Sequence, residues 1–174
     1  MIACLILIIF GLGDFISLPV PEGWTFPKHP DFNQEWRNGN PDRYLSCRGD
    51  FNGDGTIDSA FVLESKGDAN FGVFVEFSTT NDKKELVMLF DFAKTFHHID
   101  KMHYEGALAE YRSRYGIKVV SPDSFNAAFE EGKQEYTDSK SEKYELLFPG
   151  IELFEYDAGY SEFYYWDLNT KKFV

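Results

Sequence analysis

Hydrophobic residues occupy every second position through the middle of the chain, most clearly at Phe71, Val73, Val75 and Phe77. The same period of two returns at 86–92, after a polar stretch. Successive side chains of a β-strand point to opposite faces, so this period is typical of a strand with one face on a core. The pattern therefore predicts two neighbouring strands.

Shorter apolar runs lie on both sides of these two segments, separated by clusters of Gly, Pro, Asn, Asp and Ser. Short turns between consecutive strands favour antiparallel pairing in a meander. The expected strands are 43–48, 57–64, 71–77, 86–92, 117–120, 143–148, 151–156 and 160–168, with a final stub at 173–174.

Helical spacing replaces the strand pattern at 104–115, where Gly116 supplies a C-terminal stop. Shorter helical turns are expected at 33–37 and at 125–129. We therefore expect an α+β fold over 19–174, a single domain built mainly from an antiparallel β-sheet meander with one or two short helices.

The first 18 residues form a signal-like apolar leader. Its apolar run is too short to span a bilayer, which takes about 20 residues. It resembles the core of a secretory signal, although no Lys or Arg precedes it and no small-x-small cleavage site follows. The alternatives are a core-packing helix and an uncleaved anchor, the one route by which we expect the chain to touch a membrane. We predict a periplasmic or secreted protein, in which Cys47 has no disulfide partner outside the leader.

The formal net charge of −12 and the pI near 4.7 narrow the choice of partners. Such a field repels phosphate backbones, so we expect no nucleic-acid binding. It is compatible with cations or with a basic protein partner. Solubility alone also accounts for it.

One motif carries recognisable chemistry. Residues Asp50 to Asp58 read Asp-Phe-Asn-Gly-Asp-Gly-Thr-Ile-Asp. Oxygen-bearing side chains stand at loop positions one, three, five and nine, which are Asp50, Asn52, Asp54 and Asp58, and Gly55 stands at position six. Calcium takes six to eight oxygen ligands, and alternate residues of a tight loop direct their side chains to one point.

The loop resembles the first nine positions of an EF-hand, but Phe61 stands where an EF-hand has a bidentate Glu, and 59–63 is a predicted strand. Over about a dozen residues it is similar to the FG-GAP calcium loop of integrin α-subunit propellers and of secreted bacterial proteins. That loop joins two β-strands. The resemblance implies no propeller here. It implies calcium ligation by Asp50, Asn52, Asp54, the Thr56 carbonyl and Asp58, the last directly or through water.

A metal-free hairpin turn is the alternative, since Asn-Gly and Asp-Gly are strong turn formers. It explains the glycines but not three carboxylates crowded into one turn. We expect calcium to stabilise the fold rather than to switch it.

Two further clusters remain open. His97, His98 and His103 gather near Asp100, and could bind zinc or lie on the surface as ordinary polar residues. The segment 156–167 is dense in aromatic residues. With Tyr160, Tyr164 and Trp166 on one strand face and Phe163 and Tyr165 on the other, it offers either a stacking surface or core packing.

No catalytic signature occurs in the chain, so an enzyme is not the favoured interpretation. We expect an exported, calcium-stabilised binding protein, such as a periplasmic immunity or inhibitor protein that covers a basic toxin or hydrolase. The order of leader, single calcium hairpin and aromatic C-terminus also resembles uncharacterised exported bacterial proteins. The alternatives are a calcium-dependent hydrolase of the cell envelope, a carbohydrate-binding module, and a structural domain of an envelope assembly.

Overall fold

The computed structural model describes residues 20–28, 35–67, 70–79, 84–95, 114–127 and 146–174. They form two antiparallel β-sheets and a short two-stranded ladder. The larger sheet has the order β1-β3-β4-β5, and β2 also pairs with β3. Its strands are β1 (Trp24–Thr25), β2 (Ser46–Gly49), β3 (Asp58–Ser65), β4 (Phe71–Ser78) and β5 (Lys84–Asp91).

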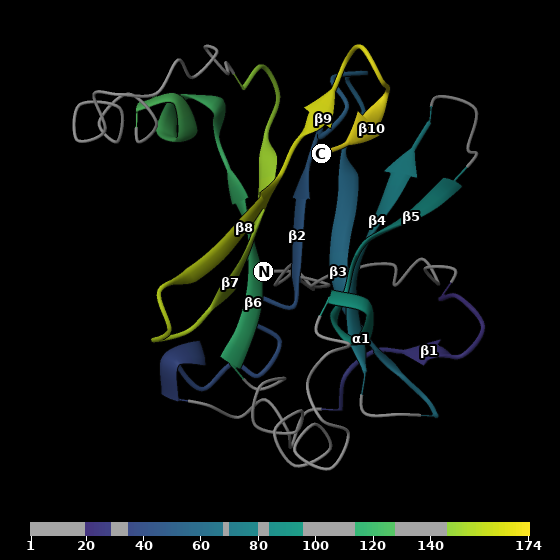
Figure 1. The fold of residues 1–174 in the computed structure, drawn as a ribbon, viewed down its shortest axis with the longest axis vertical. Coiled ribbons are helices and arrows are strands. Elements are labelled where there is room, and N and C mark those ends of the chain that lie inside the picture. The colour runs from purple at the N-terminus through teal and green to yellow at the C-terminus, as the bar shows by residue number, and fades with distance from the viewer. Residues whose placement is uncertain (1–19, 29–34, 68–69, 80–83, 96–113, 128–145) are drawn as a thin grey trace, which may run out of the picture.

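The smaller sheet has three strands in the order β6-β7-β8, and the chain then forms the β9–β10 ladder. In Figure 1 the smaller sheet lies to the left of the larger one, and β2 is the strand of the larger sheet on the side that faces it. The prediction of mainly antiparallel sheet with short helices is confirmed. The remaining elements are β6 (Tyr115–Val120), β7 (Gly150–Glu155), β8 (Tyr160–Tyr164), β9 (Trp166–Asp167), β10 (Lys172–Phe173), the 3-10 helix η2 (Glu35–Arg37), α1 (Phe92–Thr95) and a helical stretch at 122–127.

The main core lies between the two sheets. Val73 and Val75 of β4 pack there with Ile117, Ile151 and Leu153 of the smaller sheet, each at most 1% exposed. Burial of such a side chain stabilises the fold by about 1.5–3 kcal/mol. The period of two seen in the sequence thus marks the face of β4 that the smaller sheet covers.

The other face of β4 is also buried, as the hydrophobic Phe74 on that face indicates. Phe74 joins Phe61 and Leu63 in a second cluster, and Trp24 closes it with its ring edge-on to Phe74 at 4.9 Å. Trp24 lies in a short strand, β1, that the sequence pattern did not predict.

The predicted strand at 86–92 ends one residue early because Asp91 caps α1. Its Oδ1 accepts a hydrogen bond from the Lys94 backbone N–H at 3.2 Å, as an N-cap residue does. The Asn70 side chain joins both elements: its amide donates to Asp91 Oδ1 at 3.0 Å and its oxygen accepts from Ala93 N–H at 2.9 Å.

The two sheets are fastened together beside β2 and β6. Arg37 is fully buried there, and its guanidinium donates to the backbone carbonyls of Tyr115, at 2.7 Å, and of Arg43. Burial lowers the pKa of Arg37 to about 10 against the opposing effect of Asp42, so the side chain stays charged at neutral pH. The Ile117 N–H adds a 2.8 Å hydrogen bond to the Tyr44 carbonyl.

An aromatic stack covers this junction. The Trp36 ring stacks on both Tyr44 and Tyr156, with ring centroids 5.4 and 5.0 Å away and nearly parallel planes. The Arg37 guanidinium carbon lies 4.2 Å from the Trp36 ring centroid, within the range of a cation–π interaction. The segment around η2 therefore contributes a fixed anchor between the two sheets.

Cys47 lies on β2 opposite Ala60 and packs against the main core. It is a free, half-buried thiol, and desolvation raises its pKa to about 12.

Two predictions about the C-terminal third are wrong. Residues 146–148 of the expected strand 143–148 are not in a strand. The expected strand 160–168 is broken at Tyr165, where β8 ends and the chain stops pairing with β7. Tyr165 and Val174 instead exchange two backbone hydrogen bonds, at 3.0 and 3.1 Å, and this pairing extends the β9–β10 ladder.

Replacing Arg37 with Met is expected to lower the free energy of unfolding by about 2–4 kcal/mol, because the buried Tyr115 carbonyl and the partly buried Arg43 carbonyl lose their charged donor. Thermal denaturation measures the loss, as a fall in Tm of at least about 5 °C. Arg48→Met, at an exposed position of β2, is the matched control and should leave Tm unchanged. Equal melting temperatures for the two variants would contradict the anchoring role of Arg37.

Candidate functional site

The candidate calcium loop closes the hairpin between β2 and β3. The two strands are antiparallel and in register from Ser46 opposite Phe61 to Gly49 opposite Asp58. The loop therefore joins two β-strands, as the pattern around 50–58 predicted, and no helix flanks it.

Three polar side chains of the loop bind its own backbone. Asp50 accepts hydrogen bonds from the N–H groups of Asp54, at 3.0 Å, and Gly55, at 2.9 Å. Asn52 accepts from the same Asp54 N–H at 3.0 Å. The Asn52 amide donates to Asp54 Oδ2 at 3.3 Å. These contacts tie the side chains of Asp50, Asn52 and Asp54 together within a single turn.

Asp54 is the most exposed of the four candidate side-chain ligands. Its Oδ1 accepts a 2.8 Å hydrogen bond from the Thr56 N–H, and this bond lowers the pKa of the Asp54 carboxyl below its ordinary value. The carboxylate is therefore held in its charged form, which is the form that a hard cation binds.

Successive side chains of the loop point in opposite directions, so that the polar side chains lie apart from one buried aromatic ring. Phe51, between Asp50 and Asn52, is fully buried in the main core. Gly53 and Gly55 have φ angles of 74° and 83°, in the left-handed region that glycine adopts without strain. Gly53 also has no room for a side chain, since a Cβ there would lie 2.1 Å from the Phe148 ring.

Asp58 occupies a different position from the other candidate ligands. It is fully buried, and its two carboxylate oxygens accept hydrogen bonds from the N–H groups of Phe51, at 3.1 Å, and Ser78, at 2.9 Å. Burial raises the pKa of Asp58, helped by the charges of Asp54 and Asp50 and opposed by these two hydrogen bonds. The side chain thus braces the loop against the end of β4.

The donor set suits calcium only in part. Among the described residues no three Asp, Glu, His or Cys side chains lie close enough together to hold a metal. What the loop gathers is Asp50, the Asn52 amide and Asp54, hard oxygen donors of the kind calcium prefers. With the Thr56 carbonyl they would hold the ion, and water would complete its shell. Asp58 would reach it through water while keeping its two backbone hydrogen bonds.

The other two clusters have different outcomes. His97, His98, Asp100 and His103 lie outside the described residues. In the aromatic segment, Tyr164 and Trp166 pack against the main core. Phe163 faces the opposite way and is 43% exposed, with Phe125 edge-on to it at 5.5 Å.

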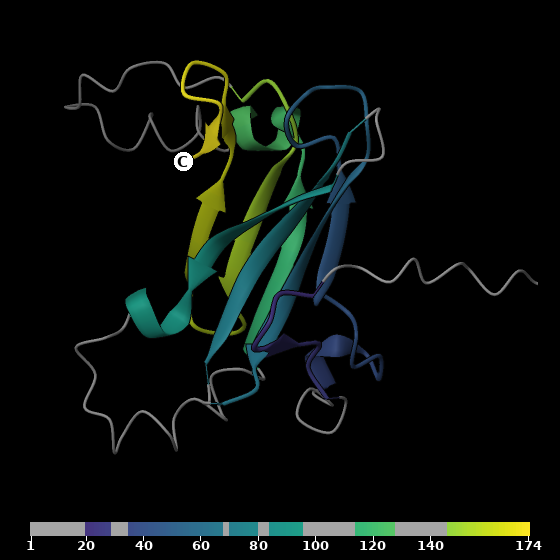
Figure 2. The same cartoon turned by 90° about the vertical axis from the view of Figure 1, so that its right-hand side faces the viewer.

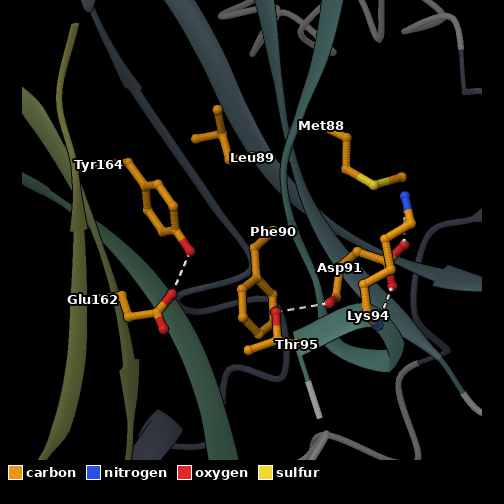
Figure 3. Close-up of a pocket in the computed structure, with 8 residues that line it drawn as sticks. All are labelled: Met88, Leu89, Phe90, Asp91, Lys94, Thr95, Glu162 and Tyr164. Atoms are coloured by element: carbon orange, nitrogen blue, oxygen red, sulfur yellow. Dashed lines mark hydrogen bonds and ion pairs between the residues drawn. The ribbon is translucent and has the colours of Figure 1, made fainter. Parts of the chain in front are cut away.

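The structure adds a hollow of about 290 Å³ between β5 and β8, which the sequence did not reveal (Figure 3). Glu162 and Tyr164 of β8 line one side, and β5 and α1 line the other. A signal was available: Glu162 and Tyr164 are two residues apart on a strand whose alternate residues face the core, so a carboxylate stood in an inward row.

No protein-family model, no curated protein and no solved structure matches the chain. None of the described helices has the length and apolar character needed to cross a membrane, and the predicted leader at 1–18 lies outside the described residues.

Gly55→Ala is expected to lower the free energy of unfolding by about 1–2 kcal/mol, because an L-residue at this positive φ is strained. Gly67→Ala is the matched control. Neither added Cβ would meet another atom within 4 Å, but Gly67 lacks the positive φ. Calcium-free thermal melts of both variants measure the difference, and equal melting temperatures would rule out the strained turn.

Calcium at 10 mM is expected to raise the free energy of unfolding by about 1.4–2.7 kcal/mol, if the Kd lies near 10⁻⁴–10⁻³ M, as in extracellular calcium modules. Differential scanning calorimetry with calcium or with a chelator would show this as a Tm difference of roughly 3–10 °C.

Asp54→Asn separates the metal site from the metal-free turn, because the amide oxygen can still accept from Thr56 N–H while the charge is lost. It should keep the calcium-free Tm and lose more than half of the calcium effect. Asp167→Asn is the control, since Asp167 accepts a similar 2.8 Å hydrogen bond from Asn169 N–H in a turn of its own. A calcium effect of the same size in Asp54→Asn would favour the metal-free turn.

Proposed function

We propose that this protein is an exported binding protein without catalytic activity, stabilised by calcium, whose partner is a basic protein such as a toxin or hydrolase that it inhibits. The proposal includes an export leader at 1–18 and a single calcium-binding α+β domain over 19–174. It places the protein in the periplasm or outside the cell, where calcium at millimolar concentration keeps a site of modest affinity filled.

The observation that carries the proposal is the loop at the β2–β3 hairpin. Its side-chain oxygens from Asp50, Asn52 and Asp54 are held within one turn by four hydrogen bonds from backbone N–H groups. Holding two carboxylates in one turn costs Coulomb energy, which a divalent cation offsets. The buried Asp58 carboxylate adds to the same negative field, so the cation would stabilise the fold as well as the loop.

The net charge supports a basic partner. With −12 on 174 residues, the protein attracts cationic surfaces over long range and speeds their encounter. Such attraction mainly increases the association rate and the specificity. The packing at the contact surface then determines how long the complex lasts.

A carbohydrate-binding module is the second candidate, and one observation favours it. Tyr156 is 48% exposed and stacks on Trp36 with an interplanar angle of 8°. A fixed, flat aromatic ring is the surface on which a sugar ring can stack.

The calcium-dependent hydrolase is less well supported. An acid/base pair needs two available carboxyl groups around a pocket. The hollow contains Asp91 and Glu162, but Asp91 already accepts from Asn70 and Lys94.

The proposal is tested by affinity capture from the envelope fraction of the source organism, with calcium or with a chelator, using the intact chain and Asp54→Asn as baits. We expect the intact chain in calcium to retain one basic protein, and the chelator or Asp54→Asn to reduce the yield at temperatures near the calcium-free Tm.

The captured protein is then purified and titrated into the intact chain by calorimetry at rising salt. Affinity should fall as salt screens the attraction. Turnover of a glycan or peptide substrate by the intact chain, with no partner captured, would contradict the proposal.

A further inference from the structure

Two aromatic rings hold the candidate calcium loop, one from the loop itself and one from a segment far away in sequence. Phe51 is the first, and it is fully buried in the main core. Phe148 is the second, a half-buried residue in the chain that leads into β7 of the smaller sheet. Figure 2 shows the blue hairpin loop and this yellow-green chain at the same end of the molecule.

The Phe148 ring covers the backbone of the loop at Gly53. One edge of the ring comes so close that a Cβ on Gly53 would lie 2.1, 2.2 and 2.6 Å from three ring carbons, whereas real Cβ atoms essentially never lie within 3.0 Å of another heavy atom. The ring therefore occupies the space that a side chain would need. Gly53 joins two candidate ligands, Asn52 and Asp54, so the ring lies against the one residue between them.

The chain on either side of Phe148 is fixed to the smaller sheet and its helix. Two residues earlier, the Asn126 amide donates to the Leu146 carbonyl at 3.3 Å, and the Asn126 oxygen accepts from the Leu146 N–H at 3.0 Å. Two residues later, Gly150 begins β7 and pairs with Val120 of β6. The position of the ring is thus set from outside the loop.

A ring packed on Gly53 restricts the conformations that the loop can adopt. Glycine loses more backbone freedom than any other residue when it is fixed, and an open loop would lose that freedom only on binding the ion. A loop that is already ordered avoids this cost and binds more tightly. The two ligands beside Gly53 are also joined by the 3.3 Å hydrogen bond from the Asn52 amide to Asp54, so fixing Gly53 fixes both.

We propose that Phe148 is a positioning residue for the calcium site, whose ring holds the Gly53 backbone so that the oxygens of Asn52 and Asp54 stay in place for the ion. The inference rests on the proposed calcium site and names the residue that keeps it in shape. Because Phe148 precedes a strand of the smaller sheet and the loop joins two strands of the larger one, calcium binding is coupled to the packing of the two sheets. Such coupling acts equally in both directions.

The test compares the full chain with Phe148→Ala and Phe148→Leu, well below the Tm of each variant, so that a general loss of stability does not register. Calcium is titrated by calorimetry. We expect Phe148→Ala to raise the calcium Kd about tenfold, because the loop must then become ordered on binding. Phe148→Leu keeps part of the apolar volume and should raise the Kd about threefold. It carries the comparison if Phe148→Ala does not fold.

Phe163→Ala is the matched control. Phe163 is another aromatic residue of the smaller sheet, 43% exposed, with Phe125 edge-on to its ring. Its loss should leave the calcium Kd within about twofold of the intact chain, since the ring is not part of the contact with the loop.

A second measurement needs no metal. Asp54 and Gly55 both donate their N–H groups to Asp50, so exchange of these two amide hydrogens with water reports how often the loop opens. Followed by NMR in a chelator, both rates should rise at least about fivefold in Phe148→Ala. Phe163→Ala should leave them unchanged.

Gly53→Ala tests the contact itself. In the intact chain the added methyl group meets the Phe148 ring and the residue is strained at its positive φ, whereas in Phe148→Ala only the strain remains. The fall in Tm on adding Gly53→Ala should therefore be smaller in the Phe148→Ala background. Gly55→Ala is the control, because a Cβ there meets nothing within 4 Å, and its effect should be the same in both backgrounds.

Three results would overturn the inference and leave the calcium site standing. These are an equal calcium Kd for the intact chain and Phe148→Ala, unchanged exchange of the Asp54 and Gly55 amides in that variant, and an equal effect of Gly53→Ala in both backgrounds. If the intact chain takes up no calcium at about 10 mM, the proposed calcium-stabilised function fails, and the role of Phe148 fails with it.

Discussion

The fold depends on one buried carboxylate that joins two distant turns. Asp58 stands at the first position of β3 and accepts backbone hydrogen bonds from Phe51 in the hairpin loop and from Ser78 at the end of β4. The buried Phe51 N–H would otherwise have no partner, which costs about 1–3 kcal/mol, and the Ser78 N–H is partly buried. With Phe51 held, its ring fills the space between the sheets. The loop is thus attached to the core through Phe51 and Asp58.

The same carboxylate carries an electrostatic cost. Its pKa is raised in the folded protein, so the fold binds a proton at Asp58 more tightly than the unfolded chain does. As the pH rises through that raised pKa, ionisation therefore takes stability away. Asp50 and Asp54 add to the cost through their charges. A divalent cation in the loop would offset the repulsion among the Asp50, Asp54 and Asp58 carboxylates. Because Asp58 also binds the end of β4, a cation at the turn could in this way stabilise the sheet.

The interpretation of 50–58 as a metal site and its interpretation as a hairpin turn are compatible. Each backbone N–H contact uses one lone pair of an oxygen, and a carboxylate has about four. Asp54 illustrates this: Thr56 N–H occupies one direction of Oδ1 while the side chain remains exposed. The turn can therefore form without metal and present its oxygens ready for it.

Local pattern predicted the strands well because β4, β5 and their turns are encoded by neighbours in sequence. It predicted for the same reason that the loop at 50–58 joins two β-strands. It did not predict the break at Tyr165, which arises from pairing with Val174. Nor did it predict Arg37, whose acceptors at Arg43 and Tyr115 come from other segments. The hollow between β5 and β8 likewise exists only once two separate sheets are packed.

The burial of Cys47 gives the molecule an internal reporter of opening. With a pKa near 12 and a half-buried sulfur, the thiol is almost entirely protonated at neutral pH and reacts slowly with alkylating reagents. Reaction becomes fast only when β2 separates from the core, and β2 leads directly into the loop at Asp50. The labelling rate of Cys47, followed separately from that of Cys4, therefore reports opening of the β2–β3 hairpin without any label engineered into the chain.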